Sequence, residues 1–154
     1  LIDDFKFRFS MRKKGVCNKN VEGYLTTPKG IFHLGNIYYR SDRVKKPFSK
    51  LKSISIKKNM GWCDDPNSKF YNKLIKIKKN LKISHEKLYR KDHKYDFFIL
   101  IKYNYKNPIK LKGSAIFLHL TKNYLPTKGC IALCEKDFLI LAKLINKKTK
   151  IKIN

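Results

Sequence analysis

The segment Ser114-Ala-Ile-Phe-Leu-His-Leu-Thr-Lys-Asn-Tyr-Leu-Pro-Thr-Lys-Gly-Cys-Ile-Ala-Leu133 constrains the fold more than any other part of the chain. It starts with an apolar run of strand length that carries His119 near its end. A loop containing Pro126 and Gly129 follows and leads to Cys130, and Pro and Gly are residues that favour chain reversal. We therefore expect a strand and a loop that folds back to bring Cys130 beside His119.

This pair of side chains suits nucleophilic catalysis. A thiol attacks as the thiolate, and histidine is the usual base because its pKa lies near neutrality. The backbone amides of Gly129 and Cys130 can hold an oxyanion, since glycine allows close backbone approach. Lys128 adds a cation that we expect to lower the pKa of the Cys130 thiol. A buried structural cysteine is the commoner alternative on residue chemistry alone.

The rest of the sequence indicates a β-rich domain. Runs of strand length, with Gly35 as an expected bulge or bend, occur at residues 5–9, 30–39, 95–105 and 149–153. Prolines and polar residues between 41 and 70 predict long loops around short strands. The apolar spacing over 135–145 is helical, with acidic residues in the first turn. The sequence thus predicts one mainly β, sandwich-like domain over residues 1–154, with long loops and one C-terminal helix.

The composition fits a folded domain with a strongly basic surface. Of the 154 residues, 42% are hydrophobic, which is enough for a core, and the net charge is +26. Such a charge suggests a polyanion such as nucleic acid. The lysines are, however, spread along the chain, and the abundant Lys, Ile, Asn, Tyr and Phe are what AT-rich codons encode. We expect a generally positive surface, no nucleic-acid partner and no transmembrane segment, since no apolar run approaches roughly 20 residues.

Two separate motifs resemble the L,D-transpeptidase (YkuD-type) catalytic domain family. His119 at a strand end, followed by the loop and Thr127-Lys-Gly-Cys130, resembles the active-site motif of that family. Far upstream, Thr27-Pro-Lys-Gly-Ile-Phe32 resembles its Thr-Pro-x-Gly-x-Phe turn and strand. Two motifs in the right order are more specific than either alone, and the resemblance extends from about residue 20 to the end of the chain.

The resemblance implies acyl transfer on peptidoglycan stem peptides through a thioester, without a cofactor. Cys130 would be the nucleophile and His119 the base, and the backbone carbonyl of Leu120 would orient the imidazole. Gly129 and Cys130 would supply the oxyanion amides. It also implies a periplasmic or cell-envelope location, although no signal peptide is visible in a chain that begins at Leu1. We expect a monomer.

The chain also departs from the pattern of better-known members. Lys128 stands where they carry a second histidine, and Ala132 stands where they carry an arginine or asparagine. Recognition of a substrate carboxylate must therefore come from elsewhere, and the candidates are Arg40, Arg90 and Lys128.

Weaker substrate-binding candidates and alternative functions remain open. His85 could line the substrate cleft or order a loop, and Trp62 could stack on sugar or peptide or anchor the core. The same active site could act as an L,D-carboxypeptidase, with water as the acceptor. A zinc-binding module would use His119, Cys130 and Cys134, with Cys63 as an optional fourth ligand. The Cys-x3-Cys spacing of Cys130 and Cys134 lies within the range for zinc. A nucleic-acid-binding protein is suggested by charge alone.

Overall fold

The computed structural model describes residues 7–11, 16–17 and 27–154, and for 16–17 it describes the backbone only. Its largest sheet, called the main sheet here, has the order β1-β11-β10-β9-β4-β12, with β5 paired to β4. The pairs β10–β11 and β4–β5 are parallel and the others are antiparallel. The strands are β1 (Phe9–Ser10), β4 (Gly30–Tyr39), β5 (Ser53–Ser55), β9 (Phe97–Ile101), β10 (Phe117–Leu120), β11 (Ile131–Leu133) and β12 (Lys150–Ile153).

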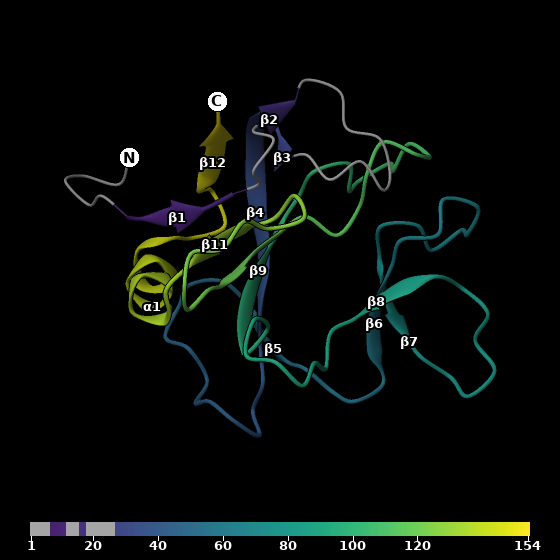
Figure 1. Cartoon of the computed structure of the whole chain (residues 1–154), viewed down its shortest axis with the longest axis horizontal. Coiled ribbons are helices and arrows are strands. Elements are labelled where there is room, and N and C mark those ends of the chain that lie inside the picture. The colour runs from purple at the N-terminus through teal and green to yellow at the C-terminus, as the bar shows by residue number, and fades with distance from the viewer. Residues whose placement is uncertain (1–6, 12–15, 18–26) are drawn as a thin grey trace.

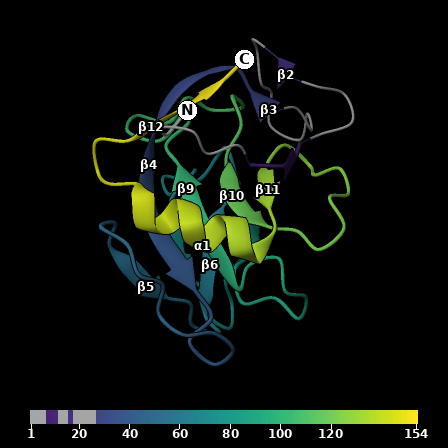
Figure 2. The same ribbon diagram turned by 90° about the vertical axis from the view of Figure 1, so that its left-hand side faces the viewer.

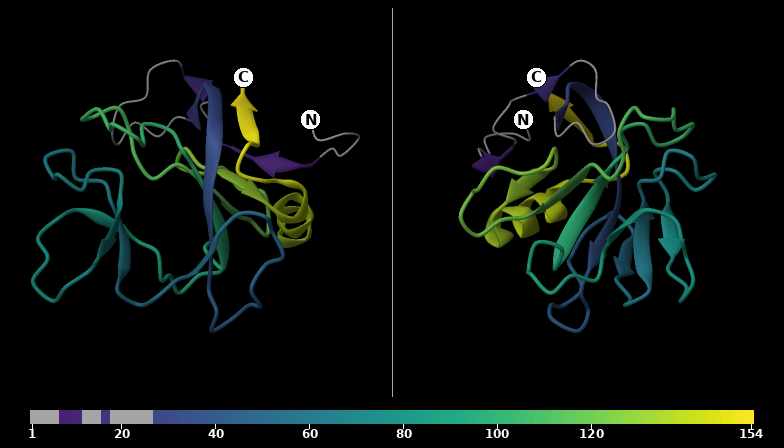
Figure 3. Two further views of the ribbon diagram at one scale, coloured as in Figure 1. Left: turned by 180° about the vertical axis from the view of Figure 1, so that it is seen from behind. Right: turned by 45° about the vertical axis from the view of Figure 1, so that its right-hand side comes forward.

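Two smaller sheets and one helix complete the described chain. A three-stranded sheet has the order β7-β6-β8, and a two-stranded sheet pairs β2 with β3. Figure 1 shows the helix α1 on one side of the main sheet and β6 to β8 on the other, and Figure 3 shows the same separation from behind. The bounds are β2 (Val16–Cys17), β3 (Thr27–Pro28), β6 (Met60–Cys63), β7 (Leu74–Lys76), β8 (His85–Lys87) and α1 (Glu135–Leu144).

Side chains on the main sheet alternate between two cores, as the period of a strand requires. On β9, Phe97, Ile99 and Ile101 belong to the core on the α1 side. Phe98 and Leu100 belong to an aromatic-rich core on the opposite side, which also contains residues of β6. All five residues of β9 are buried. The apolar run at 97–101 is therefore a central strand covered on both faces, which explains why it does not alternate with polar residues.

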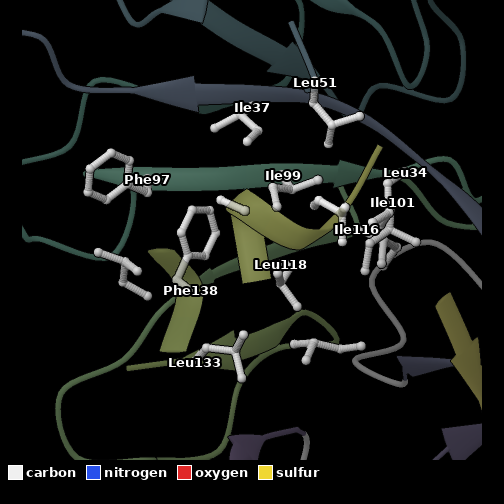
Figure 4. Close-up of a cluster of buried hydrophobic side chains, with 14 of the residues drawn as sticks. Leu34, Ile37, Leu51, Phe97, Ile99, Ile101, Ile116, Leu118, Leu133 and Phe138 are labelled. Atoms are coloured by element: carbon white, nitrogen blue, oxygen red, sulfur yellow. The ribbon is translucent and has the colours of Figure 1, made fainter. Parts of the chain in front are cut away.

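The helix α1 closes the first of these cores. Figure 2 shows it lying across the main sheet, and its buried residues Phe138 and Ala142 are spaced by one turn. The Phe138 ring stacks on Phe97 with 5.6 Å between ring centroids, as can be followed in Figure 4. Cys134 is the N-cap residue, and Glu135 and Asp137 lie in the first turn, where the helix dipole favours carboxylates.

A single buried asparagine holds together the loops behind the second core. Asn72 is 1% exposed and has a φ of 56°, a conformation that asparagine tolerates. Its Nδ2 donates to the carbonyls of Tyr103 (3.0 Å) and Asn104 (2.7 Å). Its Oδ1 accepts from Trp62 Nε1 (2.8 Å) and from the backbone N–H of Ala115 (3.1 Å). Asn72 thereby fixes the backbone that leads into β10.

The mainly β architecture with one C-terminal helix is confirmed, and β4 coincides with the predicted strand at 30–39. The pairing of β4 with β9 shifts register between Leu34 and Ile37, so the bulge expected at Gly35 is also present. A Cβ at Gly35 would lie 2.9 Å from a methyl carbon of Leu100, so this close approach requires glycine.

Three predicted strand bounds need correction or lie partly outside the described chain. The strand expected over 95–105 ends at Ile101, and Asn104 turns the chain with a φ of 46°. The strand carrying His119 begins at Phe117 rather than at residue 114, because Ala115 has a φ of 52°. Of the strand expected at 5–9, residues 5–6 lie outside the described chain, and β1 begins at Phe9.

The substitution Phe138→Ala tests the packing of α1 on the main sheet. Phe138 is fully buried, so removing its ring should lower the free energy of unfolding by about 3–5 kcal/mol. Denaturant unfolding followed by circular dichroism measures this change. Phe48→Ala is the matched control, since Phe48 is 79% exposed and should cost less than about 0.5 kcal/mol. Equal losses in the two variants would contradict the assignment of this core.

Candidate active site

The parallel pairing of β10 with β11 brings the two reactive side chains together. His119 is the register partner of Ala132, and Leu118 is the partner of Ile131. Cys130 immediately precedes β11 and therefore lies beside Phe117, whose backbone N–H donates to Cys130 Sγ at 3.4 Å. Because side chains alternate along a strand, Cys130 and His119 leave the same face of neighbouring strands. The loop thus folds back as the sequence predicts.

His119 is held as a neutral base. The residue is 7% exposed, and Nδ1–H donates to the backbone carbonyl of Leu120 at 2.9 Å, the bond expected from the resemblance. The Tyr95 ring packs against it with 5.6 Å between ring centroids. Burial is the main cause that lowers the pKa of His119 to about 4, and the cations of Lys94 and Arg90 lower it further. With Nδ1 engaged as a donor, Nε2 carries the lone pair that can accept a proton.

Cys130 is held as a neutral thiol, contrary to the sequence-based expectation. Burial raises the pKa of Cys130 to about 12, and the carboxylate of Glu86 raises it further. Sγ donates to the carbonyl of Ala115 at 3.4 Å, a contact that also favours the protonated form. Lys128 is exposed and does not offset the burial, so the expected lowering of the pKa by this cation is wrong.

The resting pair is therefore an imidazole and a thiol, not an ion pair. A thiol with a pKa of about 12 is ionised to about one part in 100,000 at pH 7. A neutral imidazole with a pKa of about 4 is present almost completely at that pH. This arrangement can transfer the thiol proton to His119 as the sulfur attacks a carbonyl, which is general-base catalysis rather than attack by a preformed thiolate.

Both side chains open onto one cleft of about 1030 Å³. Leu120, Arg90 and Lys128 also line it, so five of the residues predicted from sequence are brought together here. The cleft is lined by both acidic and basic side chains, although the net charge of the protein is +26. Its charged residues other than histidine are Asp64, Glu86, Arg90, Asp92, Lys94, Asp96, Lys122, Lys128 and Glu135.

The backbone before Cys130 has the glycine conformation that the motif requires. Gly129 has a φ of 122°, a region that other residues rarely adopt. Its N–H is directed at Thr127 Oγ1, 3.4 Å away, and the Thr127 hydroxyl in turn donates to the carbonyl of Cys130. Thr127 thus ties the turn that presents the Cys130 backbone to the cleft.

A polar network that the sequence did not reveal lies in the same cleft. Glu86 Oε1 accepts from Tyr95 Oη at 2.7 Å and from Arg90 at 3.4 Å. Arg90 is also held by Asp92 through two hydrogen bonds, which Arg90 donates from Nε (2.9 Å) and from Nη2 (2.6 Å). Since Tyr95 contacts the His119 ring, the network reaches from Asp92 to the proposed base. His85 was predicted from the sequence as a possible cleft residue, but the neighbouring Glu86 lines the cleft instead.

Three weaker candidates lie away from the cleft. Arg40 is 2% exposed, and its guanidinium is paired with Asp42 and stacked on Tyr89 at 3.5 Å from the ring centroid. Trp62 is 1% exposed, so it has no free face for stacking on sugar or peptide. His85 bonds through Nδ1 to the carbonyl of Ile83 at 2.6 Å, which orders its own loop. Their contacts lie within the fold and none of the three lines this cleft, so the structure lends no support to the substrate-binding role considered for them.

The cysteines do not assemble the zinc site considered above. Cys63 is fully buried in β6 and does not line the cleft, whereas Cys130 and Cys134 do. Within residues 7–11, 16–17 and 27–154, no group of three or more His, Cys, Asp or Glu side chains is placed to hold a metal ion. Across those same residues, no helix is long and apolar enough to span a membrane. Cys17 lies in β2, whose side chains are outside the described part of the chain.

Comparison with known proteins identified one related family. The model of YkuD, the L,D-transpeptidase catalytic domain, matches residues 6–153. No curated protein and no solved structure matches the chain. The family match covers nearly the whole chain, including β10, the loop after it and β11. It confirms the resemblance first noted at the motifs around Thr27 and Cys130.

The protonation state of Cys130 can be tested by alkylation with iodoacetamide. Because burial keeps the thiol protonated, modification at pH 9 should be at least about 100-fold slower than in the unfolded chain. The rate should keep rising as the pH rises toward 12, because thiolate forms only there. Peptide mass spectrometry measures the rate at Cys130 alone. A plateau between about pH 6 and 8 would instead reveal a preformed thiolate.

Proposed function

Because this chain belongs to the L,D-transpeptidase (YkuD) catalytic domain family, whose activity is of the L,D-transpeptidase type on peptidoglycan, we propose that Cys130 forms a thioester with a peptidoglycan stem peptide. The acyl group then passes to an amine of a second stem, which cross-links the two. The observation that carries this proposal is the placement of Cys130 and His119 on one face of β10 and β11, open to a common cleft.

In the acylation step, the Cys130 sulfur attacks the carbonyl of the third residue of the stem. His119 Nε2 takes the thiol proton as the C–S bond forms and returns it to the departing amine of the terminal D-alanine as the C–N bond breaks. The bond from Nδ1 to the Leu120 carbonyl supports this role, because it orients the ring and stabilises the transient imidazolium. Neither partner needs to be charged in the resting enzyme.

The negative charge that develops on the substrate carbonyl requires donors. The amides of Gly129 and Cys130 are proposed to supply them, supported by the positive φ of Gly129 and by the cleft-lining position of Cys130. The Gly129 N–H would have to exchange its long contact with the Thr127 hydroxyl for the oxyanion.

Recognition of the stem carboxylates is assigned to Arg90 and Lys128. Both line the cleft, and Ala132, at the position of the usual arginine, is fully buried and has no polar group to offer. Arg90 is the stronger candidate, because Asp92 holds its guanidinium in place while a third of the side chain stays exposed. The exposed Lys128 can approach a carboxylate from the loop.

Hydrolysis of the thioester by water would give an L,D-carboxypeptidase, and the same residues would carry it. Action on peptidoglycan places the chain in the periplasm or cell envelope, and we propose that it acts as a monomer. These assignments follow the family and the proposed substrate.

Acylation by a carbapenem-type β-lactam tests the nucleophile and its base. Intact-protein mass spectrometry should find one adduct, located on Cys130 and absent from Cys130→Ala. His119→Ala should slow adduct formation by about 100-fold or more, because the buried thiol then has no proton acceptor. Cys134→Ala is the matched control, since it removes a second cleft-lining cysteine and should react like the wild type.

An unmodified wild-type protein, or an adduct on Cys134, would contradict the proposal. So would a His119→Ala variant that reacts at the wild-type rate, because burial leaves the thiol with too little thiolate to react unaided.

A further inference from the structure

Glu86 occupies a position in the cleft that the acylation step does not use. It lies in β8, on the three-stranded sheet, whereas His119 lies in β10 of the main sheet and Cys130 immediately precedes β11 of that sheet. Its side chain is 32% exposed and lines the same cleft as those two residues. The fold has therefore placed a carboxylate from a different layer opposite the proposed nucleophile.

The Glu86 side chain is fixed in place yet keeps acceptor capacity. Tyr95 Oη and Arg90 both donate to Oε1. Among the described residues Oε2 has no hydrogen-bond donor, so one oxygen of the carboxylate can receive a proton from a ligand. Tyr95 also packs on the His119 ring, which fixes Glu86 relative to the base through one rigid side chain.

The other cleft carboxylates nearby are more fully occupied. Both oxygens of Asp92 accept from Arg90. Asp96 is paired with Arg43 at 2.9 Å and with His93 at 2.6 Å. In the network that reaches His119, Glu86 is thus the carboxylate that keeps an oxygen without a hydrogen-bond donor among the described residues.

A carboxylate near the thiol hinders thiolate formation, since its charge adds to the raised pKa of Cys130. Its presence therefore does not serve the first half of the reaction. A carboxylate does suit the second half of the reaction, in which the acyl acceptor must reach the carbonyl carbon of the Cys130 thioester. The acceptor of a transpeptidase arrives as an ammonium group, which is a cation.

We propose that Glu86 binds the ammonium group of the acyl acceptor beside the Cys130 thioester and thereby favours transfer over hydrolysis. This inference rests on the proposed function. The residue assists the acceptor step, and acylation of Cys130 does not require it.

The second half of the reaction balances with the groups present. The ammonium group gives one proton to the Glu86 carboxylate, which later releases it to water, and the neutral amine attacks the thioester carbonyl. The C–N bond forms, and the C–S bond breaks as the tetrahedral intermediate collapses. His119 carries a second proton from the attacking nitrogen to the departing Cys130 sulfur. One hydrogen stays on the new amide, and the free thiol is restored.

The variant Glu86→Gln tests this role with little change of shape. Its amide oxygen can still accept from Tyr95, but the charge that attracts an ammonium is gone. The assay incubates wild type and variant with a purified disaccharide tetrapeptide and measures cross-linked dimer and tripeptide by mass spectrometry. The ratio of dimer to tripeptide should fall about tenfold or more in the variant. This is the factor expected when a hydrogen bond between two charged groups, here Glu86 and the ammonium, is lost. Carbapenem acylation of Cys130 should be as fast or faster.

The control is Glu135→Gln, which removes the same charge from the α1 end of the same cleft and should leave the ratio unchanged. An unchanged ratio in Glu86→Gln, an equal fall in Glu135→Gln, or a wild type that forms tripeptide but no dimer would each overturn the inference. Slower carbapenem acylation in Glu86→Gln would also overturn it, because the residue would then serve the first step. Absence of any acylation in the wild type would instead refute the proposed function.

Discussion

The parallel pairing of β10 with β11 is the constraint on which the site depends. Two parallel strands need a connection that runs from the end of the first back to the start of the second, and residues 121–130, between Leu120 and Ile131, provide it. The resulting register sends Phe117, His119, Cys130 and Ala132 to one face of the sheet. A slip of one residue would send Cys130 to the α1 core and leave His119 without its partner. The buried contacts of the opposite face, between β9, β10, β11 and α1, hold this register.

Burial decides how the pair can react. The same packing that holds His119 and Cys130 in register limits their contact with water and favours the neutral form of each. A neutral pair is less reactive toward small electrophiles than a thiolate–imidazolium pair, and its proton moves only when a carbonyl lies within reach of the sulfur. Charged residues of both signs line the same cleft and are available to bind a substrate that carries carboxylates and an amine.

Sequence patterns predicted the elements that depend on local residue order. The strand at Gly30–Tyr39, the bulge at Gly35 and the helix at Glu135–Leu144 follow from alternation, glycine and helical spacing. The pairing of His119 with Cys130 followed from the loop between them. The bond to Leu120 was implied by the family resemblance.

Features that depend on the third dimension could not be predicted in this way. Lys128 was expected to lower the pKa of the Cys130 thiol. Lys128 is exposed, however, and desolvation of Cys130 raises that pKa instead. Arg40 and Arg90 look alike in sequence, yet only Arg90 reaches the cleft. Glu86 acquires its position through the packing of the β6 to β8 sheet against the main sheet, which no local pattern encodes.

A thioester on Cys130 is detected by measuring the mass of the Cys130 peptide during turnover of a peptidoglycan substrate. The protein is mixed with a disaccharide tetrapeptide, quenched in acid within seconds, digested and analysed by mass spectrometry. We expect the Cys130 peptide to carry the donor stem without its terminal D-alanine, and His119→Ala to abolish this species. Product formed without such an adduct, or an adduct that accumulates equally without His119, would contradict this expectation.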